Sequence, residues 1–325
     1  MDPTEKPEKR GPAQNPQPGA PEFTAWWNGS NRPLSQLNIS IFDSGFIQGT
    51  TVAEQLRTFG GKPFKVDEHV QRLMRSLEIS GIPAPQSASD FSDIIHEVAE
   101  KNFPLVDERD DLSIGLWITP GLSRKYTNAK FLDGDPFPTV CCYAHPLDFY
   151  NWNSIHSSGQ RLFTASIPQV ASWPSELKCR SRMHYHLADT EARSKDATAS
   201  ALLLDRDGFV NETSKANIVA LIDGEGLVSP RKDKILPGVS LSVVEELAQQ
   251  VGEKLTYRDI MPFELVTAKE VMLCSTAACI WPVAKIDGNQ IADGQPGEVF
   301  KRLLKEWLHL VGVDIEAQAI EFAHR

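Results

Sequence analysis

Three Asp-Gly pairs divide the second half of the chain into short paired strands. Residues 201–210 (ALLLDRDGFV), 218–229 (IVALIDGEGLVS) and 283–292 (VAKIDGNQIA) each read as an apolar run, a tight turn and a second run. Asp-Gly favours such turns because glycine accepts positive φ. Helix-like segments lie between these pairs, at 181–195, 241–252 and 297–312. Strand pairs alternating with helices in this way predict an α+β fold.

The first half of the chain predicts a smaller α+β unit. Residues 37–64 are strand-like and are broken by a hairpin-type glycine pair at 60–61. A helix is expected at 67–82, because its apolar residues recur on one helical face, and a second at 92–102. A strand at 112–119 completes the unit. No GxGxxG or GxxxxGKS motif follows a strand anywhere, so dinucleotide or P-loop binding is not supported.

Composition along the chain indicates four segments. Residues 1–22 are rich in proline and charge and contain almost no large apolar side chains, which predicts a disordered tail. Residues 23–144 form the smaller N-terminal domain. Periodicity stops at 145–154 (HPLDFYNWNS), which we expect to be an interdomain linker. Residues 155–325 form the larger C-terminal domain.

The overall charge argues for a small-molecule partner. The formal net charge is −10 and the pI is near 5.3, which disfavours nucleic acid and anionic membranes, since both require basic surfaces. No apolar run is long enough to span a bilayer or to form a signal-peptide core, so we expect no membrane association and a cytoplasmic location. The 5 cysteines and the histidines show no metal-ligand spacing, so no metal site is expected.

Four polar features of the second half are not required by core packing. Lys178 precedes a helix; Glu212 lies in a polar cluster that interrupts a strand; LPGVS (236–240) opens a helix; and STAA (275–278) offers a hydroxyl beside small residues. Taken singly, each is more often a solvated charge or an ordinary helix start. Together they supply a Schiff-base lysine, a carboxylate for a pyridinium nitrogen and two phosphate-holding turns, which are the parts of a pyridoxal phosphate site.

The order of these motifs resembles the class IV, or fold-type IV, pyridoxal-phosphate aminotransferases, which include branched-chain and D-amino acid aminotransferases and aminodeoxychorismate lyase. The resemblance covers nearly the whole chain after the tail. It is carried by FDSGFIQGTTVAEQLRTFGGKPF, then ELK, ALLLDRDGFVNETSKAN, KILPGVS and EVMLCSTAAC. It implies a two-domain fold, a homodimer and an enzyme that moves an amino group between an amino acid and a 2-keto acid.

The resemblance assigns roles to individual residues. Lys178 would form the Schiff base with pyridoxal 5'-phosphate and later move the substrate's α proton. Glu212 would pair with the pyridine nitrogen. The other cofactor-binding residues would be Arg72, Asn217, Val239, Ser240 and Thr276. Helical periodicity alone would place Arg72 in solvent, opposite the apolar face of its helix; the resemblance instead assigns it to the cofactor.

Substrate identity is less constrained, because this chain mixes features of the subfamilies. GTTVAEQLRTF resembles the branched-chain group, although Ala53 replaces the usual aromatic residue and Met183 the usual tyrosine five residues after the lysine. Arg182 resembles the lyase pattern. The candidate substrate-binding residues are Arg124, Tyr126 and Ala277. A branched-chain-type amino acid is the expected substrate; pyruvate elimination from aminodeoxychorismate, D-amino acid transamination and a catalytically silent binding protein are the alternatives.

Overall fold

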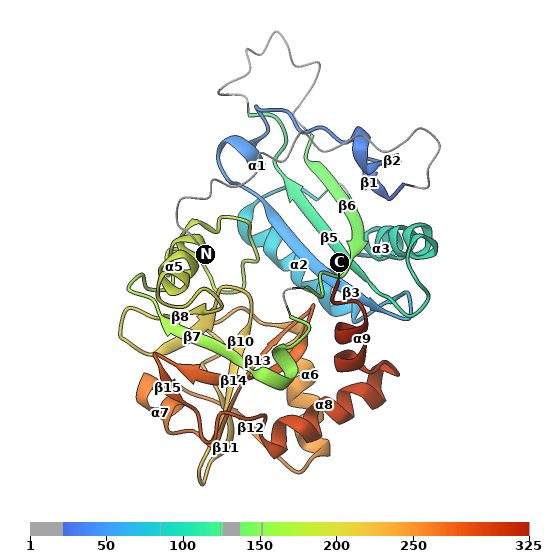
Figure 1. Ribbon diagram of the computed structural model, residues 1–325. Helices are drawn as coiled ribbons and strands as arrows, with labels where there is room; N and C mark the ends of the chain where they lie inside the picture. The colour runs from blue at the N-terminus through green and yellow to red at the C-terminus, as the bar shows by residue number, and fades with distance from the viewer. Residues whose placement is uncertain (1–21, 85, 124, 126–136, 151, 325) are drawn as a thin grey trace, which may run out of the picture.

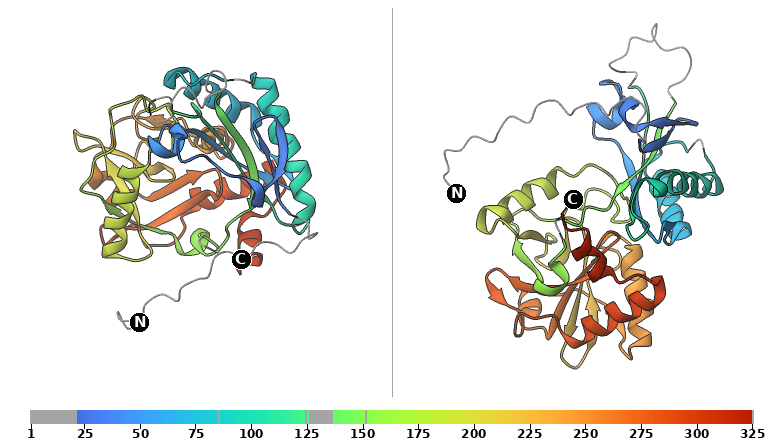
Figure 2. Two further views of the ribbon diagram at one scale, coloured as in Figure 1. Left: turned by 90° about the horizontal axis from the view of Figure 1, so that it is seen from above. Right: turned by 45° about the vertical axis from the view of Figure 1, so that its right-hand side comes forward.

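The computed structural model describes residues 22–324 except 85, 124, 126–136 and 151, and has a two-domain α+β architecture. Two sheets form the centres of the two domains, one above the other in Figure 1. Lys178 and the other described site candidates except Arg72 belong to the larger, C-terminal domain. Each sheet carries helices (Figure 2), as the alternation of strand pairs and amphipathic segments predicted.

The N-terminal sheet is antiparallel throughout its described strands, in the order β2-β1-β6-β5-β3-β4. The predicted hairpin is present: β3 pairs with β4 in antiparallel fashion, and Gly60 and Gly61 between them adopt φ of 56° and 77°. The strands are β1 (Thr24–Trp27), β2 (Ser30–Pro33), β3 (Val52–Phe59), β4 (Lys62–Pro63), β5 (Leu112–Thr119) and β6 (Thr139–Pro146).

Helices α2 (Val66–Ser80) and α3 (Ala88–Asn102) cover one face of this sheet and enclose a core with it. Acidic residues in the first turn of α2 and Gly81, left-handed at its end, favour a helix with these bounds. Ser87 and Asp90 form a capping box that starts α3. Short turns complete the domain at η1 (Leu34–Gln36), α1 (Ser44–Ile47) and η2 (Phe103–Leu105).

The C-terminal sheet is mixed, with its main path β12-β11-β10-β13-β14-β7-β8-β9 and β15 paired to β14. All three predicted Asp-Gly strand pairs are present, as β8 with β9, β10 with β11 and β14 with β15. The strands are β7 (Gln160–Thr164), β8 (Ser200–Leu204), β9 (Val210–Thr213), β10 (Asn217–Ile222), β11 (Gly226–Ser229), β12 (Leu255–Tyr257), β13 (Glu270–Ser275), β14 (Cys279–Ile286) and β15 (Asn289–Gln290).

Helices pack around this sheet and build two main cores. The apolar stripe of α8 buries Phe300, Leu303 and Trp307 against α6 and the sheet. The helices are α4 (Ile155–Ser158), α5 (Met183–Lys195), α6 (Val239–Gln250), α7 (Pro262–Val266), α8 (Glu298–Val311) and α9 (Ile315–Glu321). The last of these, α9, lies where the two domains meet, beside the lower end of β3 in Figure 1.

Residues 37–43 do not form the strand that their β-branched pattern predicted. Asp43 instead caps α1, accepting a hydrogen bond from the Gly45 N–H at 2.7 Å and one from the Thr139 hydroxyl at 2.6 Å. This capping turns the chain out of an extended course, because Asp competes for backbone N–H groups at helix starts. Ile41 is left 65% exposed as a result.

Two predicted boundary segments also differ in detail. His145 and Pro146, expected in the linker, belong to β6, and the buried Phe149 packs against Trp152 and Phe322. The expected tail at 1–22 lies outside the described residues except for Glu22, whose carboxylate accepts a hydrogen bond from the Ser35 N–H at 2.7 Å. The exact domain boundaries stay a prediction.

No helix within the described ranges combines the length and apolar character that crossing a lipid bilayer requires.

Candidate active site

Lys178 lies where the two domains touch. Its backbone carbonyl accepts a hydrogen bond from the Ala53 N–H of β3 at 3.0 Å, and its own N–H donates to the Ser76 hydroxyl of α2 at 3.1 Å. Arg180 N–H donates to Thr51 O in the same way at 2.9 Å. The segment that carries the lysine is thus held by β3 and α2, although it comes from the C-terminal half of the chain.

The amine of Lys178 is easier to deprotonate than an ordinary lysine. Burial of the amine lowers its pKa most, and the nearby guanidinium of Arg72 lowers it further against the opposing charge of Glu54, to about 8. Arg180 and Arg182 act in the same direction as Arg72. The lowered pKa increases the fraction of neutral amine near neutral pH, and the neutral amine is the form in which a lysine acts as a nucleophile or base.

Glu212 is the next-to-last residue of β9 and is buried within a ring of hydrogen-bond donors. Its Oε1 accepts from the Tyr185 hydroxyl and from Gln169 Nε2, both at 2.8 Å. Its Oε2 accepts from the Leu236 N–H at 3.2 Å and from Asn217 Nδ2 at 3.3 Å. Burial raises the pKa of this carboxyl, while the Tyr185 hydroxyl, the Leu236 N–H and the charge of Lys178 favour its ionised form.

Asn217 joins Glu212 to the loop before α6. Its Nδ2 also donates to Leu236 O at 3.1 Å, and a Cβ placed on Gly238 would lie 2.0 Å from its Oδ1. Glycine at 238 is therefore required for the close approach of loop and asparagine. Val239 and Ser240 follow at the N-terminus of α6, which starts as the LPGVS motif predicted.

Arg72 is buried, so the solvent position that helical periodicity predicted is wrong; its assignment to the cofactor, implied by the family pattern, stays a prediction. Its Nε and Nη2 bind both oxygens of Glu54 at 2.8 and 2.7 Å, and its Nη1 donates to Pro237 O at 2.9 Å. The counter-charge of Glu54, a residue of strand β3, stabilises the guanidinium of Arg72 in this buried position. Arg72 of α2 therefore links Glu54 of β3 to the loop before α6.

Three features of the chain surround this arrangement. Thr276 and Ala277 are half-buried in the turn between β13 and β14, and α6 packs against both strands. Met183 is 69% exposed, whereas Tyr185, two residues later, contacts Glu212. Arg182 stacks its guanidinium 4.6 Å from the Tyr185 ring centroid and donates to Ser214 O. The candidates Arg124 and Tyr126 lie outside the described residues.

Several residues of the site were not predicted from the sequence. Two of them, Gln169 and Tyr185, donate hydrogen bonds to Glu212. Two others form a buried pair beside Arg72, in which His69 Nδ1 lies 2.9 Å from Glu54 Oε2. The charge of Glu54 within the otherwise uncharged run VAEQL was an available signal. Nothing local marks Gln169, because its loop position is set only by the fold.

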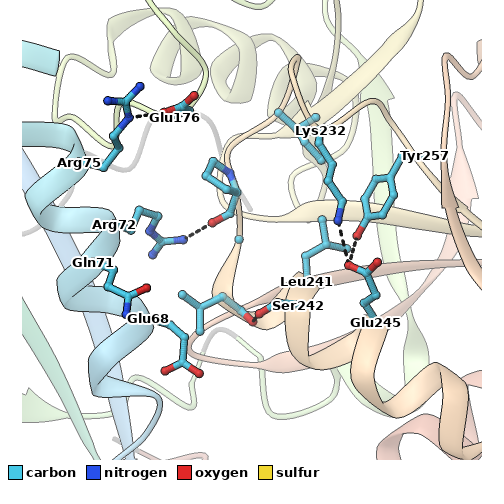
Figure 3. Close-up of a pocket in the computed structure, with 14 residues that line it drawn as sticks. Glu68, Gln71, Arg72, Arg75, Glu176, Lys232, Leu241, Ser242, Glu245 and Tyr257 are labelled. Atoms are coloured by element: carbon cyan, nitrogen blue, oxygen red, sulfur yellow. Dashed lines mark hydrogen bonds and ion pairs between the residues drawn. The ribbon is translucent and has the colours of Figure 1, made fainter.

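A cavity of about 460 Å³ is lined by Arg72, Gly238 and other residues of α2, of α6 and of the loop before α6 (Figure 3). Figure 3 shows α2 on one side and α6 with Lys232 and Tyr257 on the other. Its charged lining residues are largely paired among themselves, as with Arg75 and Glu176 at 2.7 Å and Lys232 and Glu245 at 3.2 Å. The cavity does not include Lys178, Glu212 or Thr276, so we assign no ligand to it.

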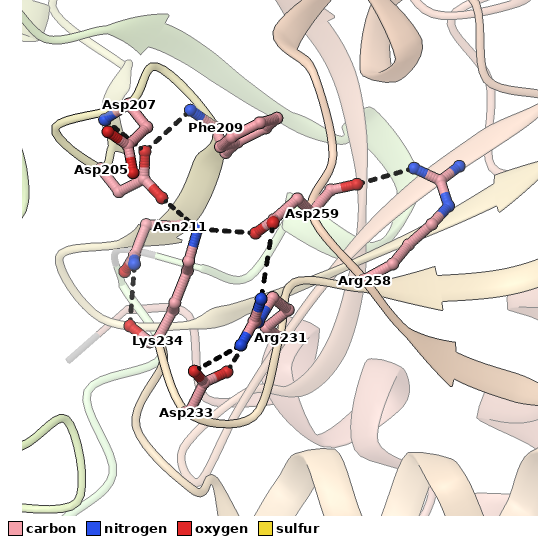
Figure 4. Close-up of polar contacts among 9 residues, drawn as sticks. All are labelled: Asp205, Asp207, Phe209, Asn211, Arg231, Asp233, Lys234, Arg258 and Asp259. Carbon is pink, nitrogen blue, oxygen red and sulfur yellow. Dashed lines mark hydrogen bonds and ion pairs between the residues drawn. The ribbon is translucent and has the colours of Figure 1, made fainter.

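The loop before α6 is braced on its outer side by the network in Figure 4. Lys234 Nζ donates to Asp205 and Asp259, at 2.7 Å each, and its carbonyl accepts from Asn211 Nδ2 at 2.8 Å. Asn211 directly precedes Glu212. The loop is thereby fixed from outside by Lys234 and from inside by Asn217 and Arg72.

No group of three or more His, Cys, Asp or Glu side chains is placed to hold a metal ion in the part of the chain that the structure describes.

Comparison with known proteins identifies the family. The family model for amino-transferase class IV matches residues 51–286. The branched-chain-amino-acid aminotransferase-like protein 1 of Arabidopsis thaliana is 30% identical over 303 residues, which is 90% of this chain and 51% of that protein. The chain thus spans about half the length of this relative. The D-alanine aminotransferase of Bacillus licheniformis is 27% identical over 280 residues, covering 85% and 93% of the two chains.

A solved structure shows the same fold. The branched-chain amino acid aminotransferase of Escherichia coli superposes with a TM-score of 0.80 at 24% identity, covering 89% of this chain and 95% of that one. The fold-type IV architecture implied by the motif order is therefore confirmed. Because the family model spans most of the chain, this protein belongs to the class IV aminotransferases.

Proposed function

We propose that this protein is a pyridoxal-phosphate-dependent transaminase that moves an amino group between an amino acid and a 2-keto acid, with Lys178 as the amine that holds the cofactor covalently. The observation that carries the proposal is the joint placement of Lys178 and Glu212. A lysine with its pKa lowered to about 8 lies within electrostatic reach of a buried carboxylate whose four hydrogen bonds fix its orientation.

The donors and acceptors of the site match the chemistry of the cofactor. Glu212 Oε2, whose two hydrogen bonds are the longer ones at 3.2 and 3.3 Å, has the weaker existing partners and would accept a pyridine N–H. Arg72, Val239 and Ser240 at the α6 N-terminus, and Thr276 would bind the phosphate, and Asn217 would lie beside the ring. When bound, pyridoxal phosphate acts as an electron sink for the α carbon of the substrate.

The protein's own groups would perform the proton transfers. Lys178, once free and neutral, would take the proton from the substrate α carbon and return it to the acceptor carbon. Glu212 would keep a proton on the ring nitrogen, and Tyr185, whose pKa is raised by burial and by the charge of Glu212, stays protonated and so continues to donate to it. Burial, together with the charges of Arg72, Arg180 and Arg182, would shift the amine of Lys178 toward its neutral form.

We propose a branched-chain-type amino acid as substrate. Support comes from the relatives and from the small residues near the candidate site, Ala53, whose N–H donates to Lys178 O, and Ala277 in the 276–278 turn. Arg124 and Tyr126 stay candidate substrate-binding residues. A lyase acting on aminodeoxychorismate is the second candidate, and one observation favours it: Arg182, which matches the lyase pattern, contributes to the charge around Lys178 and contacts Ser214.

We also propose a homodimer. Large apolar side chains are exposed around α1, with Phe46 67% exposed and Ile39, Phe42 and Ile47 between 37% and 42%. Such a patch is unusual on a monomer and favours association with a second copy. Light scattering on wild type and on Phe46→Glu tests this proposal, because the variant should shift the mass toward that of a monomer. The expected cytoplasmic location stays a prediction.

Activity assays with and without a keto acid separate these functions. The purified protein is supplied with pyridoxal phosphate and L-leucine, L-glutamate, D-alanine or aminodeoxychorismate. We expect keto-acid-dependent turnover of L-leucine. Turnover of D-alanine instead would assign the D-amino acid reaction, and pyruvate release from aminodeoxychorismate without any acceptor would assign the lyase. Absence of all turnover in a protein that binds the cofactor would overturn the enzymatic proposal.

A further inference from the structure

Arg57 is a buried arginine of β3 that the proposed chemistry does not use. It is 1% exposed, and its guanidinium reaches three different segments of the chain. Nε donates to Thr58 O at 3.1 Å, Nη1 to Ala277 O at 2.8 Å and Nη2 to Gln318 Oε1 at 2.9 Å. A residue of the N-terminal sheet thereby holds a backbone carbonyl in the C-terminal domain.

Asp111 and Gln318 fix the direction in which Arg57 points. Asp111 Oδ2 lies 3.5 Å from Arg57 Nη2 and accepts from Gln318 Nε2 at 2.9 Å. Its Oδ1 accepts from the Thr58 hydroxyl at 2.6 Å and from the Gly61 N–H at 3.2 Å. Because a planar guanidinium donates in fixed directions, these partners leave Nη1 aimed at the 276–278 turn.

The turn that Arg57 contacts needs such support. It is closed by the pairing of Ser275 with Cys279, and Cys279 has φ +62°, a left-handed conformation that is costly for a residue other than glycine. Two carbonyls of the turn are held from outside: Ala277 O by Arg57 and Ala278 O by His156 Nε2 at 3.1 Å. Arg57 Nη1 also lies 3.6 Å from Cys279 Sγ.

We propose that Arg57 is a positioning residue, oriented by Asp111 and by Gln318 of the C-terminal helix α9, that holds the 276–278 turn in the conformation in which Thr276 and Ala277 face the ligands. The inference rests on the proposed function, because that function assigns phosphate to Thr276 and substrate to Ala277. It adds a role for α9: a helix of the last residues of the chain sets the geometry of a turn at the site through one arginine.

A purely structural role for this network makes a different prediction. If Arg57 only stabilises the joint between the domains, its replacement would lower the free energy of unfolding and leave ligand affinities unchanged. A positioning role instead raises the dissociation constant of the cofactor and the KM of the amino acid, with a smaller effect on kcat, because Lys178 and Glu212 keep their own partners.

The test uses the full chain with Gln318→Leu and Arg57→Lys, and Glu321→Gln as the matched control. Glu321 lies on the same helix and forms an exposed ion pair with Arg109. We expect Gln318→Leu to raise both the cofactor dissociation constant and the amino acid KM by about tenfold, since the hydrogen bonds of Gln318 to the charged groups of Arg57 and Asp111 are lost. Arg57→Lys keeps the positive charge but loses the several directed N–H donors of the guanidinium, so it should raise the dissociation constant and the KM further. Glu321→Gln should match wild type.

Amide hydrogen exchange of residues 275–279 in the cofactor-free protein provides a readout that needs no activity. We expect faster exchange at Thr276 to Cys279 in Gln318→Leu and in Arg57→Lys, and no change in Glu321→Gln. Unchanged exchange and unchanged affinities would overturn the inference. A wild-type protein that binds no cofactor would contradict the proposed function, and exchange would then still decide whether Arg57 holds the turn.

Discussion

The two faces of strand β3 carry two buried charge networks that end in the same way. On one face Glu54 binds Arg72, whose Nη1 donates to Pro237 O. On the other face Arg57 donates to Ala277 O. Each network joins the N-terminal domain to a backbone carbonyl of a loop at the candidate site. One strand, through the alternation of its side chains, thus reaches two separate loops of the other domain.

The two networks differ in which groups stabilise the buried carboxylate, Glu54 in one and Asp111 in the other. Burial acts to raise the pKa of Glu54, but Arg72 and His69 outweigh it and hold the pKa well below its usual range. Burial raises the pKa of Asp111, whose closest partners are the neutral groups of Thr58, Gly61 and Gln318 and whose cation lies 3.5 Å away. The Glu54 network is therefore a tight ion pair, whereas the Arg57 network is mainly a set of hydrogen bonds.

The largest expected effect follows from breaking the ion pair. Glu54→Gln leaves Arg72 buried without its counter-charge, which costs about 3–5 kcal/mol of unfolding free energy. Urea unfolding of wild type and variant measures this loss, with the Glu321→Gln protein as a surface control. A loss below about 1 kcal/mol would show that Arg72 has found other partners and that the ion pair is not what holds α2 to the site.

Acid titration of stability should show opposite signs for the two acids. The folded-state pKa of Glu54 is depressed, so its stabilisation is present above its unfolded pKa of about 4.3 and is lost as the pH falls below that value. The folded-state pKa of Asp111 is raised, so its contribution becomes more favourable as the pH falls toward its unfolded pKa of about 3.9. We expect the difference in unfolding free energy between wild type and Glu54→Gln to decline as the pH falls below about 4.3. The same difference between wild type and Asp111→Asn should rise as the pH falls from the folded-state pKa of Asp111 toward about 3.9.

Urea midpoints between pH 7 and pH 3 provide this comparison. Parallel profiles for the two variants would contradict the distinction between an ion pair and a hydrogen-bond network.

The pKa of Lys178 should respond to one network and not the other. The rate at which the cofactor-free protein takes up pyridoxal phosphate should rise with pH and reach half its maximum near the lysine pKa of about 8, because only the neutral amine attacks. Glu54→Gln should lower this midpoint, since the Glu54 charge raises the lysine pKa. Arg57→Lys should leave it unchanged, because the charges that shift Lys178 most are those of Arg72, Glu54, Arg180 and Arg182.

Stopped-flow absorbance over a pH series measures the midpoint. An equal shift of this midpoint in Glu54→Gln and Arg57→Lys would mean that both networks affect the pKa of Lys178.

The smallest effect is expected at the outer brace of Figure 4. Lys234 is partly exposed, with a side chain 23% accessible, so the Asp205–Lys234–Asp259 group is screened by solvent. We expect Lys234→Met to cost about 1 kcal/mol of unfolding free energy. Cofactor affinity should change less than in Gln318→Leu, as equilibrium titration can establish. A larger loss of affinity than in Glu54→Gln would show that Lys234, and not the buried pair of Glu54 and Arg72, is the main support of the α6 loop.

Sequence patterns predicted those parts of the molecule whose determinants are local. The three Asp-Gly strand pairs and the helix after LPGVS depend on turn residues and periodicity within a few positions. The polar cluster at 212–217 does interrupt a strand, but only at 214–216, because β9 continues to Thr213 and β10 begins at Asn217. The order of motifs also identified the family. In each case the residues that determine the structure stand next to one another in the chain.

Long-range partners explain what the sequence could not predict. Arg57 contacts Gln318, which lies 261 positions away, and no local pattern distinguishes such an arginine from a surface charge. Arg72 was wrongly placed by helical periodicity because its buried position depends on Glu54 in another element. The segment 37–43 has a strand-like composition, yet the cap formed by Asp43 redirects it.

The central claim is that Lys178 holds the cofactor, and mass spectrometry of the borohydride-reduced protein tests it most directly. The purified protein is incubated with pyridoxal phosphate, reduced, digested and mapped, with a Lys178→Ala sample treated in parallel. We predict a single stoichiometric phosphopyridoxyl modification on Lys178 and none in Lys178→Ala. Modification spread over surface lysines, or equal labelling of the Lys178→Ala protein, would contradict the account.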